Sequence, residues 1–215
     1  MSAVEHAVIA AAGLGSRLGL GKPKCLLEIG GISLLARQLA LLESVPDVRI
    51  VVGFEEEVVM SAALAIRRDI VFVRNPAYRS TATLASYALG ANGIGANCLF
   101  MDADIFFDPL SFEAFLDACR PGEHLIAMTQ AKTSDAVFVD VQQDRIQGFS
   151  RDVRTDFEWA NLCWCPPGYF SPGPGAVYSC LEQDLPLPCK EIVSYEVDTP
   201  HDYEQLRGMF EREAG

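Results

Sequence analysis

Short apolar runs alternate with stretches of helical periodicity from residue 7 to residue 129. A short apolar run predicts a buried strand, whereas apolar residues three and four positions apart predict one face of a helix. Ser33 would cap such a helix, which ends before Pro46. Its predicted apolar face holds Leu34, Leu35, Leu39 and Leu42. The other predicted elements are strands at 7–10, 48–54, 70–73, 98–101 and 125–129 and helices at 55–68, 84–91 and 110–118. This alternation favours parallel strand pairing and an α/β layer fold.

The pattern changes after residue 129 and predicts antiparallel pieces. Residues 136–141 and 145–149 predict a β-hairpin around a polar turn, and 158–165 predicts a further strand. Prolines and glycines in 166–175 predict a rigid loop. The last predicted elements are a short helix at 176–183, a strand at 190–197 and a helix at 200–212 that Thr199 or Asp198 would cap, with Pro200 at its first position. We therefore predict one continuous domain over 1–215, with a nucleotide-binding half to about residue 107 and an acceptor-binding half from about 108.

A glycine-rich loop follows the first predicted strand. Its glycines are Gly13, Gly15, Gly19 and Gly21. Glycines let the backbone approach a ligand and adopt positive φ, and successive inward N–H groups form an anion-binding concavity. Arg17 adds a planar set of donors for phosphate oxygens, Lys24 adds a compact charge, and Pro23 fixes the backbone ahead of Lys24. The loop is therefore predicted to bind a triphosphate; the alternative is an ordinary glycine-rich turn between strand and helix. After it, 25–31 predicts a short extended piece that ends in a turn.

The spacing of this loop differs from the two commonest glycine motifs. Leu18 stands where the dinucleotide fingerprint has its third glycine, and Pro23 follows Gly21-Lys22 where a P-loop has Ser or Thr. The loop instead has the form Gly-x-Gly-x-Arg-x5-Pro-Lys.

A polar connection at 75–83 leads from the third predicted strand into the next helix. The connection contains the hydroxyl residues Ser80, Thr81 and Thr83, and Ser86 follows in the first turn of the helix. Such groups can cap a helix. They can also hydrogen-bond the edge of a base, because ligands of open α/β sheets bind outside the carboxyl ends of the strands. The sequence leaves both interpretations open.

Carboxylates follow two predicted strands. Asp102 and Asp104 end the strand at 98–101, and Asp198 ends the last strand. Mg²⁺ binds one or two carboxylates together with substrate phosphates. We therefore predict Asp104 and Asp198 as metal ligands and Asp102 as a supporting group. The alternatives are a solvated acidic turn and a helix cap.

Composition narrows the class of protein. Half of the 215 residues are hydrophobic, which excludes a disordered segment, and the net charge of −12 argues against electrostatic binding to nucleic acid. No apolar run is long enough for a membrane span, and the N-terminus has no basic region before its apolar stretch. The seven cysteines form no Cys-x-x-Cys pair, so we expect free, mostly buried thiols. A cytoplasmic enzyme fits these features, and a homodimer stays open.

The glycine loop resembles the signature of the nucleotidyltransferases with a Rossmann-like, glycosyltransferase-A-type fold, the group of MobA-like, sugar-phosphate and cytidylyl transferases. Met-Asp-Ala-Asp at 101–104 and Asn-Pro-x-Tyr at 75–78 resemble the bacterial choline-phosphate and phosphonate cytidylyltransferases. Glu-Val-Asp-Thr-Pro-x-Asp-Tyr at 196–203 resembles the closing motif of the wider family. The resemblance implies a three-layer fold with a mixed, mostly parallel sheet between helices and a small antiparallel extension at the acceptor site.

The resemblance also implies Mg²⁺-dependent transfer of a nucleotidyl group, cytidylyl from CTP, to a small phosphate- or phosphonate-bearing acceptor, with release of pyrophosphate. Arg17 would hold the pyrophosphate and Lys24 would stabilise charge at the α-phosphoryl group. The implied nucleotide-binding residues are Ala11, Ala12, Gly13, Gly15, Ser16, Asn75, Thr83 and Ser86.

The acceptor is less well defined by the sequence. Trp159 and Trp164 are candidate acceptor-binding residues, but their odd spacing places them on opposite faces of one strand. A sugar-1-phosphate or molybdopterin-type transferase and a non-catalytic nucleotide-binding regulator remain the alternative functions.

Overall fold

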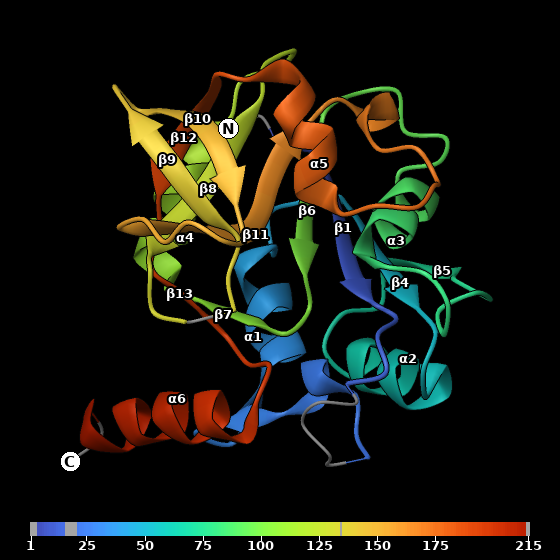
Figure 1. The fold of residues 1–215 in the computed structure, drawn as a ribbon. Helices are drawn as coiled ribbons and strands as arrows, with labels where there is room; N and C mark the ends of the chain where they lie inside the picture. The colour runs from blue at the N-terminus through green and yellow to red at the C-terminus, as the bar shows by residue number, and fades with distance from the viewer. Residues whose placement is uncertain (1–3, 16–20, 134, 214–215) are drawn as a thin grey trace.

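The computed structural model describes residues 4–15, 21–133 and 135–213 (Figure 1). The strands are β1 (His6–Ala11), β2 (Glu28–Ile29), β3 (Ile32–Ser33), β4 (Asp47–Val52), β5 (Ile70–Arg74), β6 (Cys98–Asp102), β7 (Ile105–Phe107), β8 (Leu125–Gln130), β9 (Phe138–Gln142), β10 (Arg145–Ser150), β11 (Phe157–Cys165), β12 (Leu187–Glu191) and β13 (Ser194–Glu196). The α-helices are α1 (Leu34–Leu41), α2 (Glu56–Leu64), α3 (Thr83–Gly90), α4 (Pro109–Ala118), α5 (Val177–Leu181) and α6 (Pro200–Glu213). Short 3-10 turns are η2 (Lys24–Leu26), η3 (Pro167–Tyr169) and η4 (Glu182–Asp184). The predicted alternation of strands and helices is confirmed.

One mixed sheet runs through both predicted halves of the chain. Among the described residues it has nine strands in the order β5-β4-β1-β6-β11-β8-β12-β10-β9. The strands β5, β4, β1 and β6 are parallel to one another, and β11 joins them antiparallel to β6. The first residues of β11 also pair with β9. The strands β11, β8, β12, β10 and β9 therefore form a closed ring of strand pairings. The mixed α/β sheet expected from the sequence is confirmed, and its antiparallel part continues the same sheet.

Helices cover both faces of the sheet. Successive side chains of a strand point to opposite faces, so apolar strands present a surface for helices to pack on at each face. One core contains Ile9 of β1 and Leu162 of β11 with the inner faces of α1, α2 and α4. The other contains Val8 and Phe100 with the inner faces of α3 and α5. The predicted apolar face of α1 is buried, and Ser33 caps this helix by accepting a hydrogen bond from the Ala36 amide (3.2 Å).

Two predicted elements differ from the structure. The single strand predicted at 190–197 is two strands, because the chain leaves the main sheet at Ile192 and β13 then pairs with β7. Val193 marks the change: its carbonyl accepts from the Asp108 amide (2.9 Å) and its amide donates to the Ser111 hydroxyl (3.1 Å). The extended piece predicted at 25–31 begins as η2 and continues as β2, which turns at Gly30-Gly31 into β3.

The seven cysteines are all free thiols, and all except the half-buried Cys180 are buried. Within the described ranges, no helix is both long and apolar enough to cross a membrane.

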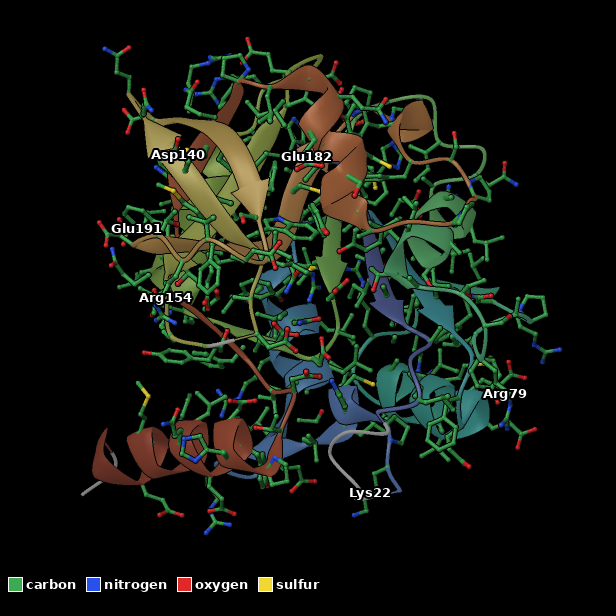
Figure 2. All side chains as sticks on the ribbon, viewed as in Figure 1. Lys22, Arg79, Asp140, Arg154, Glu182 and Glu191 are labelled. Atoms are coloured by element: carbon green, nitrogen blue, oxygen red, sulfur yellow. The ribbon has the colours of Figure 1, made fainter. Side chains whose placement is uncertain are left out.

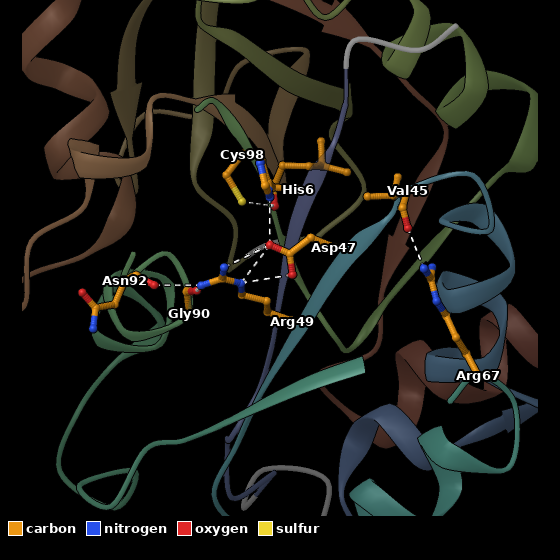
Figure 3. A network of polar contacts seen from close by, with 9 residues as sticks. His6, Val45, Asp47, Arg49, Arg67, Gly90, Asn92 and Cys98 are labelled. Carbon is orange, nitrogen blue, oxygen red and sulfur yellow. Dashed lines mark hydrogen bonds and ion pairs between the residues drawn. The ribbon is translucent and has the colours of Figure 1, made fainter. Parts of the chain in front are cut away.

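Ion pairs and carbonyl contacts fasten the parallel strands at the end opposite the glycine loop (Figure 3). Asp47 accepts hydrogen bonds from His6 (2.8 Å) and from Arg49 (3.1 and 3.2 Å). The Arg49 guanidinium also donates to the carbonyls of Gly90 (3.2 Å) and Asn92 (2.8 Å). Because Arg49 lies near the start of β4, its side chain joins this strand to the last turn of α3.

Gly90 allows α3 to pack closely on the sheet, and we predict that Gly90→Ala destabilises the protein although alanine favours helices. A methyl group there would lie 2.4 Å from Val8 Cγ1 and 2.9 Å from Val51 Cγ2. Overpacking of this kind costs about 1–3 kcal/mol. Urea unfolding would measure the loss, with Gly95→Ala as control because nothing lies within 4 Å of a methyl group there. Equal stability of the two variants would contradict the close packing.

Candidate active site

A cavity lies at the carboxyl ends of β1 and β6, where open α/β sheets bind their ligands. The glycine loop, η2, the 75–83 connection, the start of α3 and the turn after β6 line it. The predicted residues that line it are Ala11, Ala12, Gly13, Gly15, Lys24, Asn75, Thr83, Ser86, Asp102 and Asp104. Ser16 and Arg17 lie outside the described residues, so their predicted roles remain predictions.

Both the backbone conformation and the surroundings of Gly15 favour a glycine. Its φ is +61°, and a methyl group there would lie 3.0 Å from Cγ of Lys24. A larger residue would therefore both strain the loop and press on the lysine. Gly13 has open space around it and an ordinary φ, so the described structure gives no conformational reason for a glycine there.

Lys24 lines the cavity. The nearby Lys22 is exposed at the edge of the molecule (Figure 2). Pro23 precedes η2, whose turn is closed by a bond from the Leu27 amide to the Lys24 carbonyl (3.0 Å). The Lys24 ammonium donates to Asp104 Oδ2 (3.0 Å) and to Asp198 Oδ1. Burial alone would lower the pKa of Lys24, but these two carboxylates outweigh burial and raise it.

Three carboxylates meet beside Lys24. One oxygen from each of Asp104, Glu196 and Asp198 lies within 4.8 Å of the other two, a grouping that can hold a metal ion. Burial, and then the charges of Asp104 and Asp198, raise the pKa of Glu196 to about 8. Negative charge thus exceeds the charge of the one lysine, and hard oxygen donors of this kind fit a divalent cation such as Mg²⁺.

Glu196 belongs to this group of three carboxylates although it was not among the metal ligands predicted from the sequence. It belongs to the Glu-Val-Asp motif at 196–198, whose aspartate was selected. Residues two apart in an extended chain point to the same face, so this spacing carried the signal. The side-chain amide of Asn161 donates to Glu196 Oε2 (3.4 Å).

Asp102 lies near the three carboxylates and has a hydrogen-bond partner of its own. Its Oδ1 accepts a hydrogen bond from the buried hydroxyl of Tyr87 on α3 (2.8 Å). Burial, and then the charge of Asp104, raise the pKa of Asp102 to about 8. Its position beside the cluster is compatible with the supporting role expected of it.

The cap of α6 is Thr199. The Thr199 hydroxyl accepts from the Asp202 amide (3.2 Å), and the Asp202 carboxylate accepts from the Thr199 amide (2.8 Å). This reciprocal arrangement is a capping box. Asp198 therefore lies one residue before the cap, with its carboxylate on Lys24.

Asn75 organises the connection that lines the other side of the cavity. Its amide nitrogen donates to the hydroxyls of Thr81 (3.1 Å) and Ser86 (3.3 Å), and its oxygen accepts from the Ala77 amide (3.1 Å). These contacts use a side chain that is only 2 % exposed, so Asn75 shapes the pocket rather than projecting into it. Thr83 does not cap α3. The capping position is Ala82, whose methyl side chain cannot accept a hydrogen bond.

A second cavity of about 400 Å³ adjoins the first and shares Gly13, 81–83 and Asp102 with it. Asp198 and Glu196 lie on its wall. Its remaining polar and aromatic lining comes from Asp135, Arg151, Glu158, Trp159, Asn161 and Tyr178. The carboxylates beside Lys24 thus stand between the two cavities.

The two tryptophans lie on opposite faces of β11, as predicted. Trp159 lines the second cavity. Trp164 is 1 % exposed in the opposite core, and its indole N–H donates to the Arg120 carbonyl (2.9 Å). The acceptor-binding role predicted for Trp164 is therefore wrong, because packing and one backbone hydrogen bond account for this side chain.

Known proteins resemble this chain in sequence and in fold. The sequence model of the MobA-like NTP transferase domain matches residues 7–148. A CMP-5'-(3-aminopropyl)phosphonate synthase of Streptomyces rubellomurinus is 31% identical over 172 residues, which cover 73% of this chain. The chain spans only 27% of the length of that relative.

Solved structures share the fold. The inositol-1-phosphate CTP transferase of T. maritima has a TM-score of 0.77 and 17% identity, and covers 98% of each chain. A CTP:phosphocholine cytidylyltransferase of Streptococcus pneumoniae has a TM-score of 0.76 and 18% identity, over 95% of this chain and 98% of that one.

We predict that Asn75→Ala destabilises the wall of the nucleotide cavity. The change removes the hydrogen bonds of Asn75 with the Ala77 amide and the Thr81 and Ser86 hydroxyls. It leaves the buried Ser86 hydroxyl without this partner, which typically costs about 1–3 kcal/mol. Urea unfolding would measure this loss, and hydrogen exchange would show faster exchange in residues 76–82. Thr83→Ala is the control, since it removes none of the hydrogen bonds that Asn75 makes in the connection and should change stability by less than about 0.5 kcal/mol. Similar losses in both variants would mean that Asn75 does not organise the connection.

Proposed function

Because the chain belongs to the MobA-like NTP transferase domain family, we propose that it transfers a cytidylyl group from CTP to a small phosphate- or phosphonate-bearing acceptor and releases pyrophosphate. The observation that carries this proposal is the position of Lys24 and three carboxylates between two adjoining cavities. One cavity has a glycine loop suited to a triphosphate, and the other has room for a small acceptor. The names of the phosphonate and phosphocholine relatives support the choice of acceptor class.

The proposed reaction needs positioning and charge neutralisation more than acid–base catalysis. The acceptor oxyanion is already a nucleophile, so it attacks the α-phosphorus without a general base, and the bond to pyrophosphate breaks. Two anions must approach each other for this step. In our proposal Lys24 stabilises the charge that develops on the α-phosphoryl group, and the amides around Gly15 bind the phosphates. Arg17 would hold the leaving pyrophosphate.

Asp104, Asp198 and Glu196 are the proposed ligands of Mg²⁺. When bound, the ion would supply positive charge to NTP and acceptor oxygens. In the structure Lys24 forms ion pairs with two of these carboxylates, Asp104 and Asp198. We propose that Lys24 exchanges these partners for phosphate oxygens when the nucleotide binds, since the same ammonium cannot serve both sets equally.

The lining of the second cavity supports an acceptor with a positively charged end. Glu158 is only 7 % exposed, and its Oε2 accepts from the amides of Lys132 (3.1 Å) and Thr133 (3.3 Å). These bonds fix a carboxylate in the wall of a cavity that Trp159 and Tyr178 also line, and the Arg151 guanidinium lies 6.0 Å from the centre of the Tyr178 ring. Carboxylates and aromatic faces both attract an ammonium group.

The direct test is pyrophosphate release with each of the four NTPs, Mg²⁺ and a panel of phosphocholine, 2-aminoethylphosphonate and sugar phosphates. We expect release that requires both CTP and a phosphate- or phosphonate-bearing acceptor. Tight nucleotide binding without turnover on any member of the panel would instead favour a non-catalytic nucleotide-binding protein.

Lys24→Ala should lower kcat far more than it weakens nucleotide binding. A contact that stabilises transition-state charge is worth about 3–4 kcal/mol, which is a loss of roughly 10²- to 10³-fold in kcat. Steady-state kinetics measures the effect, with the exposed Lys22→Ala as a matched control. A kcat within a few-fold of wild type would remove Lys24 from the mechanism.

Asp104→Asn and Asp198→Asn should each raise the Mg²⁺ concentration needed for half-maximal activity while leaving the fold intact. Each removes a charged ligand, whereas Asp140→Asn changes an exposed carboxylate on β9 and should have no effect (Figure 2). Magnesium titrations of activity and circular dichroism spectra would measure both points. An unchanged titration curve for Asp104→Asn or Asp198→Asn would exclude that residue as a ligand.

CTP should be used in preference to UTP, and purine nucleotides should be poor substrates. In our proposal the pyrimidine lies in the pocket between Ala11-Ala12 and the Asn75–Ser86 connection, which offers backbone groups and small hydroxyls. Backbone carbonyls that face the cytosine amino group would face a carbonyl in uracil, and such a mismatch can discriminate by orders of magnitude. Comparison of kcat/KM for the four NTPs measures the preference. Faster turnover with GTP or ATP would assign the chain to the sugar-phosphate or molybdopterin branch.

A further inference from the structure

A glutamine lies on the buried face of α1, among its leucines. Gln38 is 1 % exposed and falls one helical turn from both Leu34 and Leu42. A buried amide is unfavourable unless it is hydrogen-bonded, so a polar residue at this position needs a specific reason.

The Gln38 amide nitrogen holds the turn that carries Asp104. It donates to the carbonyl of Asp102 (2.9 Å) and to the carbonyl of Ile105 (2.8 Å). These two carbonyls stand on either side of Asp104 in the chain. Both amide hydrogens are used in this way, which few side chains other than glutamine can do from one helix position.

The burial of the amide oxygen of Gln38 is unfavourable. Gln38 Oε1 is buried and has no hydrogen-bond partner among the described residues. An apolar side chain of similar length would avoid this unpaired oxygen but would take this donor from both carbonyls, of which the bond to Ile105 is buried. The amide is therefore explained by the carbonyl pair that it holds, and packing alone does not account for it.

Two further backbone groups of the turn are bonded to two other elements. The Ala103 amide donates to the Ala10 carbonyl of β1 (3.1 Å), and the Val197 amide donates to the Asp104 carbonyl (3.0 Å). The turn is thus fixed by β1 and by the segment that carries Asp198, and Gln38 supplies the third attachment. Fixed peptide planes fix the direction of the Asp104 side chain toward Lys24 and Asp198.

We propose that Gln38 is a positioning residue for the metal-binding carboxylates: it sets the direction of Asp104 by clamping the carbonyls on both sides of it. The inference rests on the proposed metal site, because its effect is exerted through Asp104. Groups that orient metal ligands typically change metal affinity about 10- to 100-fold when they are removed.

The test is Mn²⁺ binding, measured by electron paramagnetic resonance with the metal alone and with CTP present. Gln38→Met keeps the length of the side chain and removes both donors, so the apparent Kd for Mn²⁺ should rise about 10- to 100-fold. Gln38→Glu keeps the size, places acceptors against the two carbonyls, and serves as a second variant that should lose affinity in the same range. Hydrogen exchange should also be faster at Ala103 and Val197 in both variants.

Leu39→Ala is the matched control, since it truncates a buried residue of the same helix that makes no polar contact with the turn. It should lower Tm and leave the Mn²⁺ affinity at the wild-type value. Wild-type Mn²⁺ affinity in Gln38→Met and Gln38→Glu would overturn the positioning role while leaving the metal site in place. Failure of the wild-type protein to bind Mn²⁺ at all would overturn the metal site and this inference with it.

Discussion

The ion pairs of Lys24 with Asp104 and Asp198 join three parts of the chain that are far apart in sequence. The separations are 80 and 174 residues, so only the completed fold can bring these groups together. Two further carboxyl groups, Glu196 and Asp102, lie close by, and burial, followed by the negative charge of Asp104, raises the pKa of each to about 8. Lys24 offsets part of the negative charge of Asp104 and Asp198, and the oxygen atoms gathered here remain suited to a further cation.

The topology of the sheet produces this meeting point. Parallel pairing of β1 with β6 brings the glycine loop and the turn at 102–104 to the same edge. The chain then leaves the sheet after β12, pairs with β7, and bonds through the Val197 amide to the Asp104 carbonyl (3.0 Å), which delivers Glu196 and Asp198 to that edge. The capping box at Thr199 begins α6 immediately afterwards, so Asp198 is held between a short strand and a helix start.

Residues whose type and spacing carry chemistry could be predicted from the sequence. The glycine loop, Lys24 and Asp104 follow strands that hydrophobic runs revealed, and strand ends in an α/β fold share one edge. Asn75 and Ser86 were also selected, although their contacts with each other are a property of the folded loop. Trp164 was selected in error, because a sequence does not distinguish an aromatic residue that lines a pocket from one that fills a core.

Other features depend on tertiary contacts that leave no local pattern. The break between β12 and β13 follows from the contacts of Val193 with Asp108 and Ser111, more than eighty positions away. Gln38 sits on a face that reads as apolar, and only the carbonyls that it reaches explain it.

The most direct measurement of the central claim is a crystal structure with CTP and Mn²⁺, with the metal located by anomalous scattering. The account predicts the triphosphate on the glycine loop, an anomalous peak coordinated by Asp104 and Asp198, and Lys24 turned from these carboxylates to the phosphates. A nucleotide bound elsewhere, or a bound nucleotide with no metal peak and Lys24 still paired with Asp104 and Asp198, would contradict it.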